Sequence, residues 1–432
     1  MPVRLGVIAD DLTGANDTGV QFARQGARTI VPLDWHDLGA FRRIADVLVL
    51  NTNSRALAPR VAAQRARLAA EALKKAGVEA IYKKIDSTFR GNIGVELDAI
   101  LDVFPTPLTV LTPTFPPAGR AVKDGVLTVR GVPVHQTAAG RDPVTPVRES
   151  HLPTLLKGQI ARPVHSLPLG ALRGTPARAV RALREWREAN PGIILADTVT
   201  AGDLDRLVRL MLQESLCRVA AGSAGLAGAL SRALSWNSRP RRAKLCATEP
   251  ILLVIGSANP TSLEQVAWAE SHGRAVAIRA VIREIVADRD RYRRELDRTA
   301  KKACGELRAG RDTILTLAQG AGAAAGRRRA LRPSASAALS EFLGQATRRI
   351  TGLIRVGGLV LCGGDIAVSA CATLNADGLE LVGEVEPGVP WGRLVGGDLE
   401  GLPAVTKAGG FGTPEAFARA ARFLRPARGR PR

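Results

Sequence analysis

The stretch Leu5-Gly-Val-Ile-Ala-Asp-Asp-Leu-Thr-Gly-Ala-Asn-Asp-Thr-Gly19 decides how the rest of the chain is interpreted. An apolar run from Val3 to Ala9 is typical of a buried parallel strand, and it ends directly in Asp10 and Asp11. A Gly-containing turn follows, and a helical pattern begins near Asn16. Two acids at a strand end, beside a helix N-terminus, place acceptors for hydroxyls or a metal next to donors for an anion. The stretch therefore predicts a ligand loop for a molecule with hydroxyls and negative charge.

Length and composition narrow the class of protein. A chain of 432 residues is too long for one ordinary core, so two domains are expected. No apolar run approaches the ~18 residues that span a bilayer, and the N-terminus lacks a signal-peptide pattern. The five cysteines are scattered and lack CxxC spacing, which favours a reducing compartment over a zinc site or disulfide framework. We expect a cytoplasmic α/β protein with no membrane partner.

The net charge of +21 has two interpretations. One is a nucleic-acid partner; the other is arginine-rich, solvated helix faces with some bias towards anionic substrates. Dense basic clusters occur at Arg239–Lys244, Arg327–Arg332 and Arg425–Arg432. Aromatic residues make up only 4% of the chain and none interleaves with these clusters, as stacking on single strands would require. We therefore favour solvated faces over nucleic-acid binding.

The first half of the chain alternates strands and helices, which is the rhythm of a mostly parallel sheet. The expected strands are Val3–Ala9, Thr29–Leu33, Val47–Asn51, Ala80–Ile85, Leu108–Thr112, Val164–Leu167, Ile193–Asp197 and Cys217–Ala221. The expected helices are Ala15–Arg24, Arg60–Lys75, Val95–Leu101, Ala177–Arg187, Ala201–Glu214 and Leu226–Leu234. One excursion, Val126–Val129 and Val132–His135, predicts a hairpin with a two-residue turn.

A polar, basic, proline-containing stretch at residues 237–250 predicts a linker. It separates an expected first domain, 1–236, from a second, 251–425, with a basic tail at 426–432. The expected strands of the second domain are Ile251–Ile255, Ala275–Ile278, Thr313–Leu317, Leu359–Leu361, Leu379–Val385, Gly392–Val395 and Ala404–Lys407, and a helix from Pro414 to Leu424 closes it. Gly320–Ala338 is typical of a mobile loop. We predict two α/β domains with mostly parallel sheets and an active site in the cleft between them.

Three further polar loops follow strands of the first domain, and the ends of parallel strands converge on one crevice. The residues expected there are Asp10, Asp11, Asn51, Arg55, Lys84, Asp86, Ser87, Arg90 and Asn92. Cations for a carboxylate and acids or amides for hydroxyls suit a small polyhydroxy acid. Any one of these residues alone is as well explained by a helix cap or surface ion pair. The polar region from His135 to Ser150 is either a lid over the site or a loop that only connects two elements. His135 and Asp142 either bind substrate or make hydrogen bonds within that loop.

The second domain carries three glycine-containing loops at expected strand ends. They are Ile255-Gly-Ser-Ala-Asn-Pro-Thr261, Leu361-Cys-Gly-Gly-Asp365 and Thr406-Lys-Ala-Gly-Gly-Phe-Gly-Thr413. Ser257 and the loop amides suit phosphate oxygens, and Lys407 stands beside the turn formed by Gly409 and Gly410. One such loop is weak support, but three with an acid and a lysine favour a nucleoside triphosphate. No GxxxxGK[ST] occurs, Ala9 excludes a DxDxT phosphatase, and no His pair or Cys/His cluster has metal-ligand spacing.

These motifs resemble the four-carbon acid sugar kinases, which include erythronate, threonate and 3-oxo-tetronate kinases. The resemblance runs from about Val3 to Leu424. Its motifs are Ile8-Ala-Asp-Asp-Leu-Thr-Gly-Ala-Asn-Asp-Thr18, Lys84-Ile-Asp-Ser-Thr-Phe-Arg-Gly-Asn92, Pro113-Thr-Phe-Pro, Gly256-Ser, Gly363-Gly-Asp365 and Lys407-Ala-Gly-Gly-Phe-Gly412. It implies that an N-terminal domain binds the sugar acid and a C-terminal domain binds ATP, which phosphorylates the terminal hydroxyl.

The resemblance also implies site residues. Those expected to meet the substrate are Asp11, Arg55, Lys84, Ile85, Asp86 and Ser87, and those expected to meet ATP are Ser257, Gly363, Gly364, Asp365, Ile366 and Gly409. The family usually has Thr or Ser after Gly-Gly-Asp, so Ile366 removes a hydroxyl that suits phosphate or Mg²⁺.

As a mechanism we expect Mg²⁺ to bridge the phosphates of ATP, with Lys407 and the loop amides stabilising the transferred group. Arg55 and Lys84 would hold the carboxylate, and Asp10, Asp11 or Asp86 would orient or deprotonate the attacking hydroxyl. The competing hypotheses are a basic nucleic-acid-binding protein without catalysis and another sugar-acid phosphotransferase or phosphatase. The sequence does not decide whether the chain forms a homo-oligomer.

Overall fold

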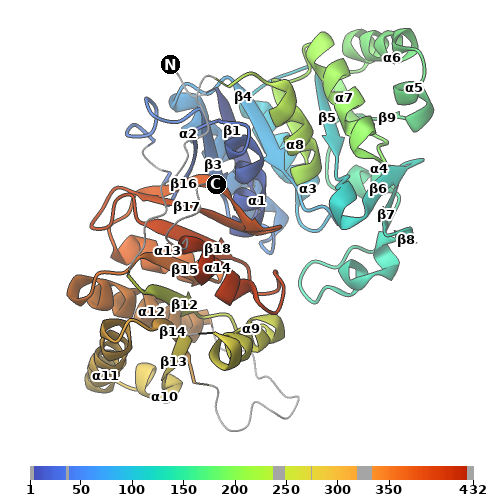
Figure 1. Ribbon diagram of the computed structural model, residues 1–432. Coiled ribbons are helices and arrows are strands. Elements are labelled where there is room, and N and C mark those ends of the chain that lie inside the picture. Colours follow the sequence, from blue (N-terminus) through green and yellow to red (C-terminus); the bar gives the residue numbers. More distant parts are fainter. Residues whose placement is uncertain (1–3, 36–37, 237–248, 274, 319–332, 426–432) are drawn as a thin grey trace. The chain divides into compact units, whose positions relative to one another are not determined.

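The computed structural model describes residues 4–35, 38–236, 249–273, 275–318 and 333–425. The chain divides into two compact units, unit 1 (residues 1–241) and unit 2 (residues 242–432), and each is described by itself (Figure 1). The predicted linker lies outside the described residues except for its last two positions, and the predicted basic tail lies outside them entirely.

Unit 1 is built on a parallel sheet with the strand order β2-β3-β1-β4-β11-β5-β10-β9. The strands are β1 (Leu5–Ala9), β2 (Thr29–Pro32), β3 (Val47–Asn51), β4 (Ala80–Lys84), β5 (Leu108–Thr112), β9 (Val164–Leu167), β10 (Gly192–Ala196) and β11 (Val219–Gly222). The last residue of β1, Ala9, is in register with Asn51 on one side and Lys84 on the other. The loops that leave these three strands therefore start side by side.

Helices flank this sheet, and they are α1 (Leu12–Ala23), α2 (Pro59–Lys75), α3 (Ile93–Val103), α4 (Leu152–Lys157), α5 (Leu169–Arg173), α6 (Pro176–Ala189), α7 (Ala201–Gln213) and α8 (Ala224–Ala233). Alanines recur along one side of α2 and are buried, whereas its arginines and lysines are on the solvent side. Helix α2 packs on α3, and α1 packs on α8.

Helix α1 begins at Leu12 rather than near Asn16. Asp11 is its N-cap, because Asp11 Oδ1 accepts a hydrogen bond from the Gly14 N–H at 2.8 Å. The ligand loop is thus shorter than predicted, and its second acid also starts a helix.

A small antiparallel sheet formed by β6 (Arg120–Lys123), β7 (Val126–Val129) and β8 (Val132–Pro133) contains the predicted hairpin. Its first strand was not predicted. Strand β8 stops at Pro133, where the 3₁₀ turns η2 (Val134–Gln136) and η3 (Ala138–Arg141) follow; a further turn, η1 (Pro116–Ala118), precedes β6.

Unit 2 has five parallel strands in the order β13-β14-β12-β15-β18, extended by the antiparallel strands β17 and β16. The strands are β12 (Ile251–Ile255), β13 (Ala275–Ala280), β14 (Asp312–Leu317), β15 (Gly358–Cys362), β16 (Gly378–Glu386), β17 (Val389–Val395) and β18 (Pro403–Lys407). The helices are α9 (Pro260–His272), α10 (Ile282–Ile285), α11 (Arg289–Arg308), α12 (Pro333–Leu353), α13 (Gly364–Thr373) and α14 (Ala416–Leu424). Apolar residues of β12 and β15 pack against α14 around the buried Phe417.

The predicted α/β class with mostly parallel sheets is confirmed in both units. The predicted mobile loop Gly320–Ala338 is wrong in its last part, because residues 333–338 form the start of α12; residues 320–332 lie outside the described part. Among the helices of the described ranges, none combines the length and the apolar content needed to cross a bilayer.

Candidate functional site

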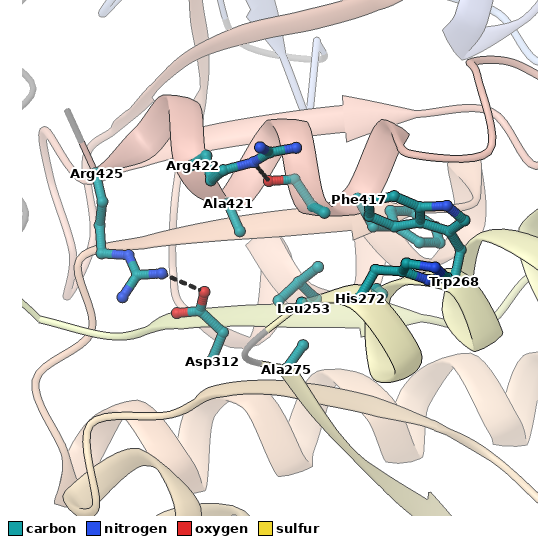
Figure 2. A pocket seen from close by; sticks show the side chains of 12 residues that line it. Leu253, Trp268, His272, Ala275, Asp312, Phe417, Ala421, Arg422 and Arg425 are labelled. Atoms are coloured by element: carbon teal, nitrogen blue, oxygen red, sulfur yellow. Dashed lines mark hydrogen bonds and ion pairs between the residues drawn. The ribbon is translucent and has the colours of Figure 1, made fainter. Parts of the chain in front are cut away.

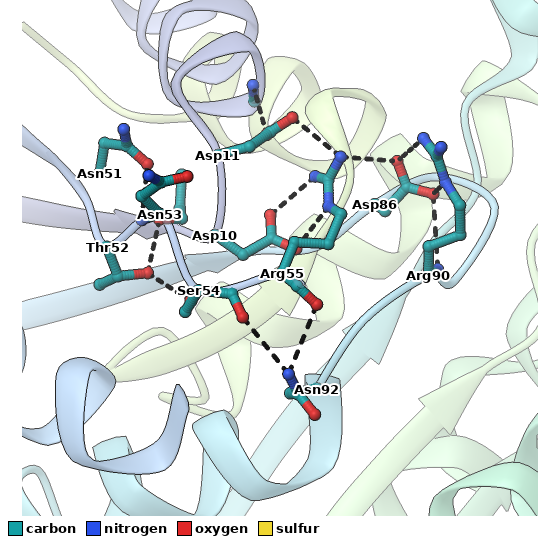
Figure 3. A network of polar contacts seen from close by, with 12 residues as sticks. Asp10, Asp11, Asn51, Thr52, Asn53, Ser54, Arg55, Asp86, Arg90 and Asn92 are labelled. Carbon is teal, nitrogen blue, oxygen red and sulfur yellow. Dashed lines mark hydrogen bonds and ion pairs between the residues drawn. The ribbon is translucent and has the colours of Figure 1, made fainter. Parts of the chain in front are cut away.

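In unit 1, one guanidinium gathers three carboxylates from the predicted strand-end loops (Figure 3). Arg55 Nε and Nη2 donate to the two oxygens of Asp10, each at 2.8 Å. Arg55 Nη1 lies 2.8 Å from Asp11 Oδ2 and 3.7 Å from Asp86 Oδ1. The bidentate pair with Asp10 fixes the plane of the guanidinium. The loops after β1, β3 and β4 are therefore joined by side-chain charges.

A second arginine extends this network. Arg90 Nε and Nη2 donate to the oxygens of Asp86 at 2.9 and 3.0 Å, and Arg90 Nη1 donates to Asp142 Oδ2 at 3.0 Å. The backbone reverses to allow this, with φ of 66° at Phe89 and 95° at Gly91. A bulky residue in this left-handed region is uncommon, and such conformations gather at functional sites.

The charges of the network stabilise one another. Burial alone would raise the pKa of Asp10, but the Arg55 guanidinium, with help from Lys83 and Lys84, holds it below its ordinary value. Burial likewise opposes ionisation of Asp86, and hydrogen bonds from Arg90 together with the charge of Arg55 hold its pKa far below the usual range. Both carboxylates are thus ionised at neutral pH. Asp11, with 28% of its side chain exposed, is the most accessible of the three acids around Arg55.

Lys84 lies on the α1 side of the sheet. A Cβ at position 14 would lie 2.8 Å from Lys84 Nζ, so Gly14 leaves the room that the ammonium occupies beside the first turn of α1. The residue is only 5% exposed, yet its Nζ has no hydrogen bond or ion pair within the described ranges. Its charge acts on the Asp10 and Asp86 carboxylates without a direct contact, so its ammonium is available to an anionic ligand.

The preceding residue, Lys83, points to the opposite face of the sheet, because side chains alternate along a strand. Its Nζ lies 2.5 Å from Glu96 Oε2 on α3, and each residue is 1% exposed. Sequence reasoning missed this pair. The signal was two consecutive lysines in a strand that is buried on both faces, since the inward lysine then needs a partner.

Other predicted residues of unit 1 have structural contacts. Asn92 Nδ2 donates to the Leu57 carbonyl at 2.8 Å and also contacts the carbonyls of Ser54 and Arg55, so it holds the loop that carries Arg55. Asn51 Oδ1 accepts from the Asn53 N–H at 2.9 Å.

Two further predicted residues follow β4. Ile85 is buried and its N–H donates to the Gly222 carbonyl at 2.9 Å, whereas Ser87 is half-buried in the loop before Arg90. His135 is not part of the network, because its Nδ1 lies 2.7 Å from Ser150 Oγ.

A cavity of about 410 Å³ adjoins the network at Arg55. Its lining residues are Arg55, Ala56, Leu57, Phe89, Gly91, Asn92, Val144, Thr145, Pro146, Val147, Arg148, Glu149, Leu155 and Gln159. The segment 144–149 is tied to the network through Asp142, whose Oδ1 accepts from the N–H groups of Val144 and Thr145. The network therefore has an open space beside it.

In unit 2, the three predicted glycine loops meet at the carboxyl ends of β12, β15 and β18. A Cβ at position 409 would lie 2.1 Å from Ser257 Oγ, and the Gly363 N–H donates to the Lys407 carbonyl at 3.0 Å. Helix α13 begins after Gly363, which has φ of 109° and no side chain to cap it. Its first amides are open to an anion.

The remaining predicted residues of these loops divide into exposed and buried ones. Gly364, Asp365 and Gly410 are exposed. Ile366 is buried, and its Cδ1 would lie 2.4 Å from a Cβ at position 256. The side chain at position 366 therefore packs inward against Gly256.

Lys407 is buried inside its loop. Its Nζ donates to the carbonyls of Ala408 at 2.8 Å, Phe411 at 2.9 Å and Gly409 at 3.3 Å. Burial lowers the pKa of this ammonium, against the opposing effect of neighbouring Cys362. These contacts hold the loop in shape, and the predicted contact of Lys407 with the transferred phosphate stays a prediction.

Unit 2 also has a cavity of about 430 Å³ between α9 and α14 (Figure 2). Its lining residues are Leu253, Trp268, Ala269, His272, Gly273, Ala275, Asp312, Phe417, Ala418, Ala421, Arg422 and Arg425. Trp268 stacks on His272, and Arg425 Nη2 lies 2.6 Å from Asp312 Oδ2. None of these residues belongs to the three glycine loops, so this cavity is separate from them. Across the described part of the chain, no group of three or more His, Cys, Asp or Glu side chains is arranged to hold a metal.

Comparison with known proteins relates both units to characterised families. Residues 5–230 match the family described as a sugar-binding N-terminal domain, and residues 252–417 match the nucleotide-binding C-terminal domain. A D-threonate kinase of Salmonella typhimurium is 35% identical over 95% of this chain and 96% of its own length. A D-erythronate kinase of Heliobacterium modesticaldum is 32% identical over 95% of this chain and 94% of its own length.

A solved structure of another Salmonella typhimurium protein covers 99% of this chain and 100% of its own, with a TM-score of 0.84 and 23% identity. That likeness shows a shared fold.

Proposed function

Because this chain belongs to the four-carbon acid sugar kinases, with their sugar-binding N-terminal and nucleotide-binding C-terminal domains, we propose that it transfers the γ-phosphate of ATP to the terminal hydroxyl of a four-carbon sugar acid. The observation that carries the proposal is the nearly full-length similarity to kinases acting on such acids. The network around Arg55 and the glycine loops supply the chemistry that each half of the reaction needs. No observation favours the alternative of a nucleic-acid-binding protein.

We assign the acid to the carboxylate network of unit 1. Lys84, a nearly buried cation that makes no direct ion pair with a described carboxylate, pairs with the substrate carboxylate. Asp11 is the accessible acid, and its Oδ2 accepts a hydrogen bond from a substrate hydroxyl while Arg55 holds it in place. Asp10 and Asp86 fix Arg55 from the buried side. The adjoining cavity is lined by Arg55 and Asn92 but not by Asp11 or Lys84, so it gives space beside the assigned groups rather than around them.

We assign ATP to the three glycine loops of unit 2. The open amides at the start of α13 and the hydroxyl of Ser257 donate to phosphate oxygens. Lys407 keeps the third loop in shape through its three carbonyl contacts. This loop leaves space for phosphates because Gly409 has no side chain.

Mg²⁺ fits this assignment through Asp365. The ion keeps several waters in kinases and takes one or two protein carboxylates together with substrate phosphates. Asp365 is an exposed carboxylate in the first turn of α13, beside the open amides. When bound there, the ion would neutralise charge on the phosphates.

The test is ADP release with D-threonate, D-erythronate and 3-oxo-tetronate in the wild-type chain and in Asp11→Asn. We expect turnover with at least one acid and a loss of about 10²–10⁴-fold in kcat for the variant. Asp102→Asn is the control, because Asp102 lies in an exposed ion pair with Arg67 on α2. Wild-type protein that turns over none of the acids would refute the proposal, whereas an unaltered Asp11→Asn would remove only Asp11 from it.

We also place the enzyme in the reducing cytoplasm, because the four described cysteines, Cys217, Cys304, Cys362 and Cys371, are all free thiols.

A further inference from the structure

The Lys83–Glu96 pair has no part in the assignments above, yet it is the most completely buried ion pair of the described residues. Both residues are 1% exposed and their charged atoms are 2.5 Å apart. Removing two charges from water is costly, and replacing such a pair by apolar side chains is often neutral or stabilising. Fold stability therefore does not explain why a lysine and a glutamate occupy these positions.

The pair is connected to the backbone that carries the network. Glu96 Oε1 accepts a hydrogen bond from Ser54 Oγ, and Ser54 Oγ lies 2.7 Å from Thr52 Oγ1. Thr52 Oγ1 donates to the Ala9 carbonyl at 3.0 Å, and the Ser54 N–H donates to the Asp10 carbonyl at 2.9 Å. Through these contacts α3 and β4 hold the two loops that meet at Asp10.

The next residue after Ser54 is Arg55, whose N–H also donates to the Asp10 carbonyl, at 3.3 Å. A shift of Ser54 would therefore move the guanidinium that joins Asp10, Asp11 and Asp86. The geometry of the whole network depends on a hydroxyl that is oriented by Glu96.

Lys83 and Glu96 also act on the Asp10 carboxylate through their charges. Asp10 is faced by Arg55, Lys83 and Lys84 as cations, and the Asp10 and Glu96 carboxylates oppose each other's ionisation. Burial raises the pKa of Glu96, the Lys83 ammonium counteracts this as the next-largest effect, and the charge of Asp10 adds a smaller rise. Lys83 thus acts on two carboxylates, on Glu96 of α3 through an ion pair and on Asp10 of the loop after β1 through its charge.

We propose that Lys83 and Glu96 form a positioning pair that sets the Arg55 loop on Asp10 and balances the Asp10 carboxylate from the buried side. Neither residue touches the substrate. The inference rests on the proposed function, since its consequence is measured on the acid half of the kinase reaction.

The test is the double variant Lys83→Met with Glu96→Leu, which replaces the pair by apolar side chains of similar volume. We expect it to melt at or above the wild-type temperature, because no buried charge is left unpaired. We expect kcat with the sugar acid to fall about 10–100-fold, with the KM for ATP unchanged. Loss of the Lys83 charge raises the pKa of Asp10 and loss of the Glu96 charge lowers it, so the acid limb of the pH profile of kcat/KM moves to higher pH by the difference between the two.

Two further variants separate positioning from charge. Glu96→Gln keeps a side-chain acceptor for Ser54 and removes the charge, so it retains more kcat than the double variant while its melting temperature falls. The exposed pair between α2 and α3 gives the matched control Arg67→Met with Asp102→Leu, which leaves kcat and the pH profile unchanged.

The outcomes are distinct. A wild-type chain without turnover would contradict the proposed function and not this inference, for which thermal stabilisation by D-threonate remains as a readout that the double variant should lose. A folded double variant with wild-type kcat, pH profile and D-threonate stabilisation would show that the pair is only structural, and would overturn the inference.

Discussion

The two units present their proposed ligands with different parts of the chain. In unit 1 the binding groups are charged side chains from three strand ends, and they are already paired with one another around Arg55. In unit 2 the groups are backbone amides and small side chains, and the charged Lys407 is turned into the loop. A small hydroxy acid needs directional side-chain partners, whereas a phosphate fits a row of amides.

This difference predicts which kind of substitution disturbs each unit most. Substitutions in unit 1 should act through charge, because each ion of the network depends on the others. Substitutions in unit 2 should act through steric clashes, because an added Cβ at Gly409 would collide with Ser257.

The largest effect is expected for Arg55→Met. The change leaves Asp10 without its bidentate partner in a buried position, and breaking such a pair costs about 3–5 kcal/mol. We expect a lower unfolding free energy in urea and a kcat/KM for the acid reduced by about 10³-fold. Arg67→Met is the control, since its ion pair is exposed and worth about 0.5 kcal/mol. Equal losses in both variants would contradict the charge-based interpretation of unit 1.

Gly409→Ala should show the complementary behaviour of unit 2. The new methyl group would lie 2.1 Å from Ser257 Oγ, so the loop must move away from the phosphate position. We expect the KM for ATP to rise by about 10–100-fold, which corresponds to ~1.4–2.7 kcal/mol, with the KM for the acid unchanged.

Gly352→Ala is the matched control for this glycine. Position 352 lies in α12 with no heavy atom near the added Cβ, so the change should stabilise the helix by about 0.5–1 kcal/mol and leave both KM values unaltered. A rise in the KM for ATP in both glycine variants would show that the effect at position 409 is not local.

Lowering the pH should reduce the stability of unit 1 before that of unit 2. The pKa values of Asp10 and Asp86 lie below their ordinary values in the folded chain, so their stabilisation is present above the unfolded pKa and is lost as the pH falls towards the folded one. We expect unfolding free energy to decline below about pH 5. Hydrogen exchange should show earlier loss of protection in residues 86–92 than at α13. In Asp86→Asn the decline should be shallower, and an unchanged slope would speak against Asp86 as its source.

The smallest effect is expected for Ile366→Thr. The family resemblance attributes a phosphate or Mg²⁺ contact to a hydroxyl here, but the side chain at 366 is buried against Gly256. We expect a loss of about 1–2 kcal/mol in stability from the buried hydroxyl and a change in the KM for ATP of less than about threefold. A tenfold gain in ATP affinity would instead support the role implied by the resemblance.

Much of the fold could be predicted because buried parallel strands are short apolar runs with clear ends. The expected and observed bounds agree at Val47–Asn51, Leu108–Thr112 and Ile251–Ile255. Helix α1 was predicted to start too late, since the signal for its start is the Asp11 cap rather than apolar periodicity. Strand β6 was missed because a four-residue edge strand has too few residues to show alternation.

The residues that meet in the candidate acid site could be predicted, but not how they pair with one another. The order of strands places the loops after β1, β3 and β4 together. The positive φ angles at Phe89 and Gly91 turn Arg90 back to Asp86. A left-handed backbone at a phenylalanine cannot be predicted from the residue type. Likewise, the sequence shows a lysine beside a glycine-rich turn, but only the fold of the loop directs Lys407 to the carbonyls.

The mutual pairing around Arg55 has a consequence for how the substrate arrives. Counting Asp10, Asp11, Asp86 and Asp142 against Arg55, Arg90 and Lys84, the network has a net charge of −1 although the chain carries a surplus of 21 positive charges. An approaching anion is therefore drawn to the molecule in general rather than to its binding place. Added salt should slow the encounter only mildly, and short-range hydrogen bonding should govern how long the acid stays.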